Sequence, residues 1–511
     1  MLKVPDKDAP AIHETGGSPH AVVVGSGFGG LAAAIRLGAR GFRVTVLEKL
    51  DRPGGRAYVY HDDGFVFDAG PTVITAPFLL DELWALAGAK VSDDVEIVPV
   101  YPFYRIRFHD GETFDYSDDE ERMDREIARF EPRDVDGFRR LLTSCEKIYR
   151  IGFERLVDVP FSTPLDMARI VPHLLALRCD RSVYAHVSAY LRNERLRRVF
   201  SFHPLLVGGN PLKITSMYSL IMYLERHGGV HFAMGGTNRL VDGMVRLVEE
   251  RLGGTVRCEA EVDEILVEGG AAKGVRLKSG EIVRSDIVVS NADSAYTYKH
   301  LVPSAHRRRW TDAKLDAAKY SMGLFVWYFG TDRTYPDVAH HTILLSEDYK
   351  GLLTDIFDRK ILSDEFSLYL HRPTATDPSM APAGCDAFYV LSPVPHLQSG
   401  VDWTVTAEPY RKRIEAFLAA TILPGLDRHV VTSHLLTPLD FRDRLNSIHG
   451  AGFGLQPLLL QSAWFRPPNR SEEVGNLYLV GAGTHPGAGL PGVISSAKVL
   501  DRVGPHPATF R

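Results

Sequence analysis

The chain has 511 residues, of which 45% are hydrophobic and 24% are charged, and its formal net charge is −5. These values are typical of a globular protein, and a chain of this length usually forms more than one domain of about 100 to 200 residues. Its 59 basic and 64 acidic residues include no long basic run, which excludes a protein that binds nucleic acid through a basic surface.

Residues 1–19 are polar and rich in proline and glycine, so we expect a flexible tail. The tail lacks the apolar stretch of about 7 to 15 residues that a secretory signal needs, which favours a cytoplasmic protein. No segment reaches the roughly 18 apolar residues of a membrane-spanning helix, so we expect any membrane contact to be peripheral. The four cysteines lie far apart in the sequence and are interpreted as isolated thiols, and we expect no metal site.

The first predicted elements form a βαβ unit. Residues 21–24 are a short, apolar, β-branched run that ends at glycine, which predicts a buried parallel strand. A helix is predicted next, because residues 31–37 are mostly small and apolar and two glycines, Gly38 and Gly41, end the run. Residues 42–47 predict the second strand.

The sequence GSGFGG at residues 25–30 lies between the first strand and the helix. In this spacing Gly25 permits a tight turn, Gly27 lets the backbone approach a pyrophosphate, and Gly30 lets the helix pack closely on the strand. Glu48 follows about 20 residues downstream, where an acidic side chain accepts a hydrogen bond from a ribose hydroxyl. Together these features predict a Rossmann-like dinucleotide site at the positive end of the helix.

The sequence DRPGGR at residues 51–56 follows the acidic residue directly. Gly55 frees the backbone to approach a phosphate, and Arg56 supplies charge-assisted hydrogen bonds to it. This combination resembles the flavoprotein superfamily that includes the amine oxidases and the carotenoid desaturases, in which the dinucleotide is FAD. In this resemblance residues 67–73 match the segment that approaches the flavin ring, and Gly70 and Thr72 are the implied contacts.

Two later segments are interpreted as helices. Residues 117–120 have the spacing of a capping box, which predicts the start of a charged helix whose solvated face extends to residue 136. Residues 164–181 combine leucines and other apolar residues with arginines. This pattern is typical either of a helix in a lipid interface or of a helix that packs on the core, and we expect Pro172 to bend it.

Further strands are predicted in two later parts of the chain, at residues 254–258, 262–265, 272–277, 287–290 and 476–480. A Gly/Pro-rich loop follows the last of them and leads to a helix predicted at residues 495–503. We therefore expect an α/β fold in which the FAD-binding domain is discontinuous and is built from residues 20–100, 231–295 and 471–505. An inserted α+β domain, expected to bind the substrate and the membrane, is assigned to residues 101–230 and 296–470.

The Gly/Pro-rich loop has an expected use at the flavin. Reduced flavin carries negative charge near N1 and the C2 carbonyl, which the amides of Gly492 and Val493 at a helix start would stabilise. Other members of the superfamily place an acidic residue after the last strand glycine, whereas this chain has Gly483 and Thr484. We expect the backbone and the Thr484 hydroxyl to meet the phosphate side there.

Longer strings narrow the resemblance to the bacterial-type phytoene desaturases. They lie in the family's order at residues 200–211, 234–237, 291–293, 461–466 and 480–493, and the likeness extends from about residue 21 to residue 502. The motifs and this resemblance together give the following candidate FAD contacts: Gly25, Gly27, Gly30, Glu48, Lys49, Gly55, Arg56, Gly70, Thr72, Val262, Asn291, Gly483, Thr484, Gly492 and Val493.

The resemblance implies an amine-oxidase and GDP-dissociation-inhibitor type of fold and FAD-dependent desaturation of phytoene. Several steps would lead towards neurosporene- or lycopene-type polyenes, with hydride passing to FAD and then to a quinone or oxygen. Only one dinucleotide fingerprint is present, so we expect no NAD(P) site. A hydrocarbon substrate needs a long apolar channel, and the aromatic run at residues 325–329 fits either a channel wall or a core strand.

Three other functions share parts of this pattern: a carotenoid isomerase or oxygenase, an amine oxidase, and a prenyl-binding GDP-dissociation inhibitor without flavin. Arg56 and the complete loop at residues 481–493 argue against the last of these. His203, His449 and His485 lie in family-like strings, but we interpret them as hydrogen-bonded structural residues. The sequence indicates neither a catalytic base nor an oligomeric state.

Overall fold

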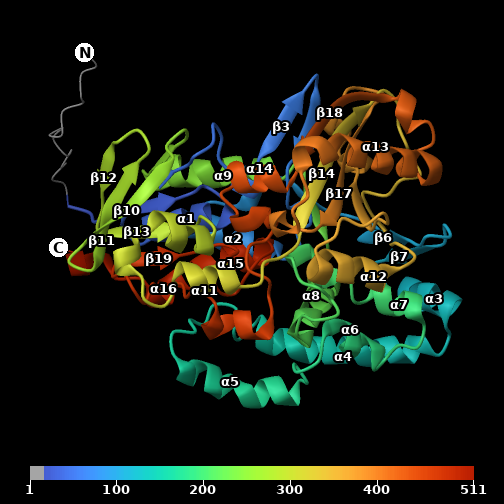
Figure 1. Cartoon of the computed structure of the whole chain (residues 1–511), viewed down its shortest axis with the longest axis horizontal. Helices are drawn as coiled ribbons and strands as arrows, with labels where there is room; N and C mark the ends of the chain where they lie inside the picture. Colours follow the sequence, from blue (N-terminus) through green and yellow to red (C-terminus); the bar gives the residue numbers. More distant parts are fainter. Residues whose placement is uncertain (1–16, 511) are drawn as a thin grey trace.

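A five-stranded parallel sheet forms one layer of the fold (Figure 1). The computed structural model describes residues 17–510, so most of the predicted tail lies outside the described residues. The strand order is β19-β13-β1-β2-β9, and each strand is parallel to its neighbours. The strands are β1 (His20–Val24), β2 (Arg43–Leu47), β9 (Thr255–Arg257), β13 (Ile287–Ser290) and β19 (Leu477–Leu479).

Helix α1 (Phe28–Ala39) joins β1 to β2, which confirms the predicted βαβ unit. The helix begins earlier than its apolar run suggests, because its N-cap is Gly27, inside the glycine motif. It is buried on nearly all sides because it contacts the sheet and also three helices. These helices are α2 (Pro77–Leu86), α9 (Asn238–Arg246) and α15 (Leu490–Lys498).

Three separate parts of the chain supply the parallel sheet, as the predicted strands indicate. The strands predicted at residues 262–277 lie beside it in a small antiparallel sheet of their own. That sheet contains β10 (Val262–Glu268), β11 (Ala271–Leu277) and β12 (Ile282–Arg284). Two short antiparallel pairs complete this part: the hairpin of β3 (Val59–Asp62) and β4 (Phe65–Asp68), and the pair of β5 (Ile97–Pro99) with the distant strand β8 (His231–Ala233).

A seven-stranded mixed sheet forms the second layer, at the upper right of Figure 1. Its order is β18-β14-β17-β16-β15-β6-β7, and only the pair of β15 and β6 is parallel. The strands are β6 (Tyr104–Arg107), β7 (Thr113–Tyr116), β14 (Gly323–Thr331), β15 (His341–Leu344), β16 (Leu368–His371), β17 (Asp386–Val394) and β18 (Val430–Leu436). All but two of these strands come from the second inserted segment.

The aromatic run at residues 325–329 is a core strand. In β14, Phe325, Trp327 and Phe329 pack into one cluster with side chains of α13 (Trp403–Thr421). Side chains alternate between the two faces of a strand, so the residues on the other face of β14, Leu324 and Val326, line the cavity described below. Of the two alternatives, the core strand is therefore confirmed, and none of these aromatic rings lines the cavity.

Short helices fill the first inserted segment. They are α3 (Glu120–Phe130), α4 (Asp134–Gly152), α5 (Pro164–Ala176), α6 (Val183–Ser188), α7 (Glu194–Val199) and α8 (Leu220–Gly228). The capping box predicted at Ser117 is wrong, because Asp119 is the N-cap of α3 and accepts a hydrogen bond from the Arg122 amide. Ser117 is buried instead, and the charged segment is broken between α3 and α4.

Helix α5 lies at the edge of the molecule (Figure 1). None of its residues is buried, and Leu165, Val171 and Leu175 are 57%, 42% and 61% exposed. Helix α5 is therefore not a buried core helix. Within residues 17–510, no helix combines the length and the apolar character needed to span a bilayer.

The last predicted helix begins earlier than expected, since α15 starts at Leu490 with a proline in its first turn, where proline is favoured. It is followed by α16 (Leu500–Val503). The remaining helices are α10 (Ser294–Tyr296), α11 (Asp312–Ala317), α12 (Tyr349–Thr354) and α14 (Pro438–Asp443). All four cysteines lie in the described part of the chain and are free, as predicted.

Candidate cofactor and substrate cavity

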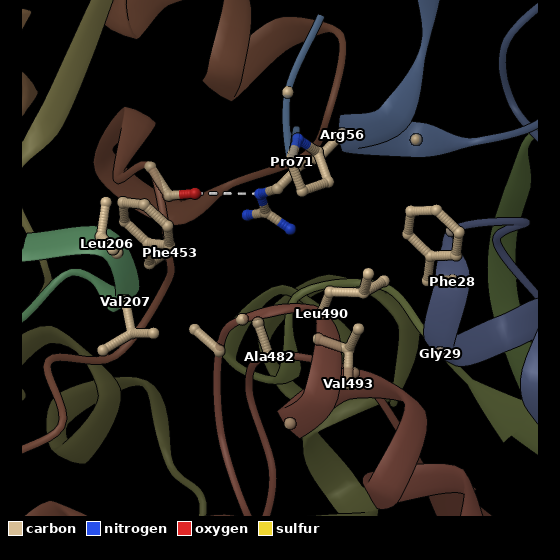
Figure 2. A pocket seen from close by; sticks show the side chains of 18 of the residues that line it. Phe28, Gly29, Arg56, Pro71, Leu206, Val207, Phe453, Ala482, Leu490 and Val493 are labelled. Carbon is tan, nitrogen blue, oxygen red and sulfur yellow. Dashed lines mark hydrogen bonds between the residues drawn. The ribbon is translucent and has the colours of Figure 1, made fainter. Parts of the chain in front are cut away.

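A cavity of about 570 Å³ extends from the glycine loop after β1 to helices α5 and α8. Its wall includes residues from both sheets and from the loop before α15. Figure 2 shows Arg56 and Pro71 on one side and Leu490 and Val493 facing them. Of the fifteen candidate FAD contacts, all line this cavity except Gly30, Gly483 and Thr484.

The glycine loop has the geometry that the motif predicts. Gly25 has a φ of 91°, which glycine adopts without strain. A Cβ atom on Gly30 would lie 2.0 Å from the Gly25 carbonyl oxygen, so only glycine allows α1 to start against this turn. Gly30 is thus a packing residue, whereas Gly25 and Gly27 face the cavity.

Asn291 closes the other side of the glycine loop. A Cβ atom on Gly27 would lie 2.9 Å from its Nδ2 atom, and one on Gly29 would lie 2.6 Å from its Oδ1 atom. The side chain therefore packs directly on the backbone at the positive end of α1. This arrangement brings together two predicted sites that are more than 260 residues apart in the sequence.

Glu48 lies at the end of β2 and lines the cavity. Its Oε2 atom accepts hydrogen bonds from the Ser26 amide at 2.9 Å and the Ser26 hydroxyl at 2.5 Å. Its Oε1 atom accepts one from the Leu50 amide at 2.9 Å. These bonds hold the carboxylate at the rim of the glycine loop, where a ribose would reach it.

Lys49 and Val262 line the same end of the cavity. The Lys49 ammonium donates to the Asp443 carbonyl at 2.6 Å and lies 3.5 Å from Glu261. Its charge is thus already paired within the protein. Val262 begins β10 next to Glu261 and lies on the wall of the cavity.

Arg56 points into the cavity (Figure 2). Its Nε atom donates to the Gly452 carbonyl at 2.9 Å, and Nη2 donates to the Ser447 hydroxyl at 2.8 Å. Nη1 makes no hydrogen bond within residues 17–510. Burial lowers the pKa of the guanidinium, which the nearby Asp293 carboxylate partly opposes. A buried guanidinium with a free N–H group facing a cavity suits an anionic ligand.

Gly70 and Thr72 lie beside Arg56. A Cβ atom on Gly70 would lie 2.0 Å from the Arg56 carbonyl oxygen, so this segment packs directly on the arginine backbone. The Thr72 hydroxyl shares hydrogen bonds with the hydroxyls of Tyr389 at 2.7 Å and Tyr369 at 3.1 Å. Burial raises the pKa of both tyrosines, so these hydroxyls stay protonated at neutral pH.

Three buried histidines lie next to these three hydroxyls, and none of the three histidines lines the cavity. His340, His341 and His371 each bring a ring nitrogen within 4.8 Å of the others, although no metal site is expected from the sequence. Tyr369 shares a hydrogen bond of 2.7 Å with His341, and His371 shares one of 3.0 Å with His340. Burial lowers the pKa of His340 to about 3 and those of the other two well below the usual value. The three rings are therefore neutral.

The loop before α15 places only part of its predicted contacts on the wall. Gly492 and Val493 line the cavity, but the Val493 amide donates to the Gly489 carbonyl at 2.9 Å. The Gly492 amide has no partner among the described residues and is a free donor at this helix start. The expected use of the Val493 amide is therefore wrong, and Val493 contributes its side chain (Figure 2).

Gly483 and Thr484 do not reach the cavity. The Thr484 side chain is fully buried and donates to the Pro467 carbonyl at 2.7 Å. The Gly483 carbonyl accepts from the Ser294 hydroxyl at 2.9 Å, and a Cβ atom on Gly483 would lie 2.4 Å from that hydroxyl oxygen. Both residues hold the loop on the body of the protein. The expected phosphate contact of Thr484 is thus replaced by an internal hydrogen bond.

The far end of the cavity is apolar. Met167, Ile170 and Leu174 of α5 line it, and the spacing of these residues places them on one face of the helix. Helix α8 contributes its own face through Leu220, Ile221, Leu224 and Glu225. Glu225 is the only charged residue among the α5 and α8 residues at this end of the cavity.

Glu225 is a site residue that the sequence analysis missed. Its side chain is 0% exposed to solvent, and its Oε1 atom accepts a hydrogen bond of 2.8 Å from the Tyr104 hydroxyl. Nε2 of His203 lies 3.2 Å from Oε2, without the alignment of a hydrogen bond. The signal was present in the sequence, because Glu225 follows Ile221 by four residues and thus shares the apolar face of a helix.

Histidines predicted as structural differ in their surroundings. Nε2 of His485 donates a hydrogen bond of 2.9 Å to the Leu156 carbonyl, and burial lowers the pKa of this histidine to about 4. His449 shares one of 3.1 Å with Gln398. These two confirm the interpretation, whereas His203 lies against a buried carboxylate at the cavity.

Comparisons with known proteins agree with this geometry. The family described as flavin containing amine oxidoreductase matches residues 28–383. A neurosporene-forming phytoene desaturase of Cereibacter sphaeroides is 50% identical, over 98% of this chain and 98% of its own. A lycopene-forming phytoene desaturase of Pantoea ananas is 48% identical, over 93% of this chain and 97% of its own.

Solved structures share the fold at low sequence identity. Cyclohexylamine oxidase from Brevibacterium oxydans has a TM-score of 0.63 at 16% identity, covering 97% of this chain and 100% of its own. An oxidoreductase from Methanosarcina mazei has a TM-score of 0.64 at 19% identity, covering 94% of this chain and 100% of its own. These likenesses concern the fold alone.

Proposed function

Because the chain belongs to the phytoene desaturase family of flavin-containing amine oxidoreductases, we propose that it introduces double bonds into phytoene in carotenoid biosynthesis. The observation that carries this proposal is the sequence identity of 48 to 50% to phytoene desaturases over nearly the full length of the chain. The chain is an FAD-dependent oxidoreductase, and the cavity offers what both FAD and a hydrocarbon require.

The polar end of the cavity fits FAD. The glycine loop and Asn291 form a cradle that side chains on Gly27 or Gly29 would fill, and the start of α1 directs its positive end there. Arg56 keeps a free N–H group for a phosphate or the flavin edge. When bound, FAD accepts a hydride from the substrate. We assign Glu48 to the ribose and Gly492 to the flavin edge.

The apolar end fits a hydrocarbon. A substrate without polar groups is held by shape and by exclusion of water rather than by hydrogen bonds. Helices α5 and α8 supply such a wall with their apolar faces. Leu205 and Val207, from the segment that joins the two helices, add to it. These residues orient the reacting carbons and keep water from the site.

Helix α5 is proposed as the place where the protein meets the membrane. Met167, Ile170 and Leu174 face the cavity. Leu165, Val171 and Leu175 are exposed to solvent. A helix that is apolar on both faces joins a lipid surface to the cavity, so that phytoene passes from one to the other without crossing water. Residues 164–181 hold three arginines against two aspartates, and this small excess of positive charge favours anionic lipids.

The electron acceptor would also reach the protein from the membrane at α5. A quinone dissolves in the membrane that supplies phytoene, so we propose a quinone, or oxygen, as the oxidant. Both neurosporene-forming and lycopene-forming relatives are similar to this chain at 48 to 50% identity. We therefore propose several successive desaturations, whose number the products reveal.

The test is an incubation of the FAD-loaded protein with phytoene in liposomes, with a quinone or oxygen and without NAD(P). We expect the colourless substrate to gain absorption at longer wavelength as the conjugated polyene grows, and chromatography identifies the products. If phytoene stays colourless while a cis-carotenoid is isomerised or gains oxygen, the protein is an isomerase or an oxygenase instead. Turnover of soluble amines with peroxide release would indicate an amine oxidase.

A further inference from the structure

Five carboxylates line the cavity in the described residues, and Glu225 differs from the other four. Glu48 accepts from two backbone amides, and Glu261 lies against two lysines. Asp293 accepts from the amides that begin α10, and Asp440 accepts from the Thr437 amide at the start of α14. Each of these four thus has a structural use.

Glu225 has no amide, lysine or arginine partner among residues 17–510. Tyr104 donates to Oε1, which leaves Oε2 as the oxygen without a hydrogen bond. Its neighbours on the wall, Ile221 and Leu224, are hydrocarbon, and the glutamate is fully buried. A buried carboxylate in an apolar wall is costly to maintain, so it marks a functional group.

We propose that Glu225 is the catalytic base that accepts the proton lost in desaturation, with His203 as its positioning residue. This inference rests on the proposed function. One substrate carbon gives up a hydride with its electron pair to the bound flavin. The neighbouring carbon then loses a proton, its C–H electrons become the π bond, and the proton forms an O–H bond with Oε2 of Glu225.

The proton balance closes at the oxidant. The carboxylic acid holds its proton until the quinone or oxygen that takes the two electrons also takes the proton. A carboxylate suits this place because it becomes neutral on accepting a proton, whereas an imidazole becomes charged. The histidine on the same cavity wall, His485, illustrates this, because burial lowers its pKa to about 4.

Tyr104 and His203 have separable roles. Tyr104 orients the carboxylate by holding Oε1, so that Oε2 is directed away from it. His203 lies 3.2 Å from Oε2 and is 2% exposed, and the Phe202 ring stacks on its own. An imidazole fixed at this distance restricts the position of Oε2 and does not itself line the cavity.

The test compares variants of the FAD-loaded protein by the bleaching of its flavin when it is mixed with phytoene liposomes without oxygen. Glu225→Gln keeps an acceptor for Tyr104 but cannot take a proton, so we expect flavin reduction to slow by about 10²- to 10⁴-fold. FAD content and phytoene binding should stay unchanged. Glu194→Gln is the matched control, because Glu194 also accepts from a tyrosine hydroxyl, Tyr184, but lies outside the cavity.

Tyr104→Phe separates catalysis from structure. It removes the hydrogen bond between Tyr104 and Glu225, which Glu225→Gln keeps, but leaves the carboxylate, so we expect a loss of less than about tenfold. Infrared difference spectra provide a second readout. A carboxylic acid band that shifts in D₂O should appear on reduction of the wild type and be missing in Glu225→Gln. His203→Gln should shift the pH profile of flavin reduction while FAD content is kept.

Two results would overturn the inference. One is a Glu225→Gln protein that is reduced by phytoene within about threefold of the wild-type rate. The other is a Tyr104→Phe protein that loses as much as Glu225→Gln, which would make Glu225 structural. A wild-type protein that phytoene does not reduce is a different failure: it removes the proposed function, and this inference with it.

Discussion

Gly27 and Arg56 carry the contacts proposed for the pyrophosphate and can be tested one residue at a time. A valine at residue 27 would place its side chain against Asn291 Nδ2, 2.9 Å from the Cβ position, and would close the cradle. Arg56→Ala would leave the phosphate charge unpaired. We expect both variants to lose FAD during gel filtration, measured by the ratio of flavin to protein absorbance.

Arg52 provides the control for charge, because it is an exposed arginine of the same loop that does not line the cavity. Arg52→Ala should keep its flavin. Circular dichroism shows whether each variant is folded. A folded Gly27→Val protein with one FAD per chain would contradict the fingerprint assignment.

At the scale of elements, α5 presents two apolar faces with different uses. Replacing Leu165, Val171 and Leu175 by serine removes exposed apolar surface without altering the cavity wall. Fully burying one such side chain in lipid contributes about 1.5–3 kcal/mol, so even partial burial of all three makes us expect binding to liposomes to weaken by roughly tenfold or more. Flotation of the protein with liposomes measures this, and FAD content should not change.

The control variant places serines at Ile361, Val405 and Val431, which are exposed to a similar extent on other elements. It should bind liposomes as the wild type does. Leu174 is left out of the membrane variant because it lines the cavity, and Leu174→Ser would change substrate binding as well. Equal losses in both triple variants would mean that α5 is not the membrane contact.

At the scale of the whole molecule, buried histidines make stability depend on pH. Burial lowers the pKa values of His186, His396 and His485 to about 4, below the value of 6.5 in an unfolded chain. The unfolded state therefore binds more protons between these limits, and stability falls as the pH drops from about 6.5 to 4. Asp68 has the opposite effect, since burial raises its pKa to about 6.

These three histidines outnumber Asp68, so we expect the stability of the folded protein to fall as the pH drops. At pH 5.5 each buried neutral histidine costs on the order of 1 kcal/mol, and the urea midpoint should be lower than at pH 7.5. His186→Gln should flatten this dependence, whereas exposed His109→Gln should leave it unchanged. A midpoint that is the same at both pH values would contradict the prediction.

The sequence by itself determined the parts of this protein that depend on local spacing. Gly25 and Gly30 have the turn and packing roles expected from their motif, because a tight turn before a helix admits only glycine at these two positions. The strands of the parallel sheet were also predictable, since a buried parallel strand is a continuous apolar run. The likeness of the strings to one family then indicated FAD and phytoene.

Only the tertiary structure decided which side chains meet. Glu225 belongs to α8, Tyr104 to β6, and His203 to the short 3-10 helix His203–Val207. No local pattern in the sequence links these three residues, although they lie together in the fold. The direction of a side chain depends on what packs against its segment, so Thr484 points to Pro467 and not to a phosphate. For the same reason Phe325, Trp327 and Phe329 of β14 face α13, while Leu324 and Val326 on the other side of the strand face the cavity.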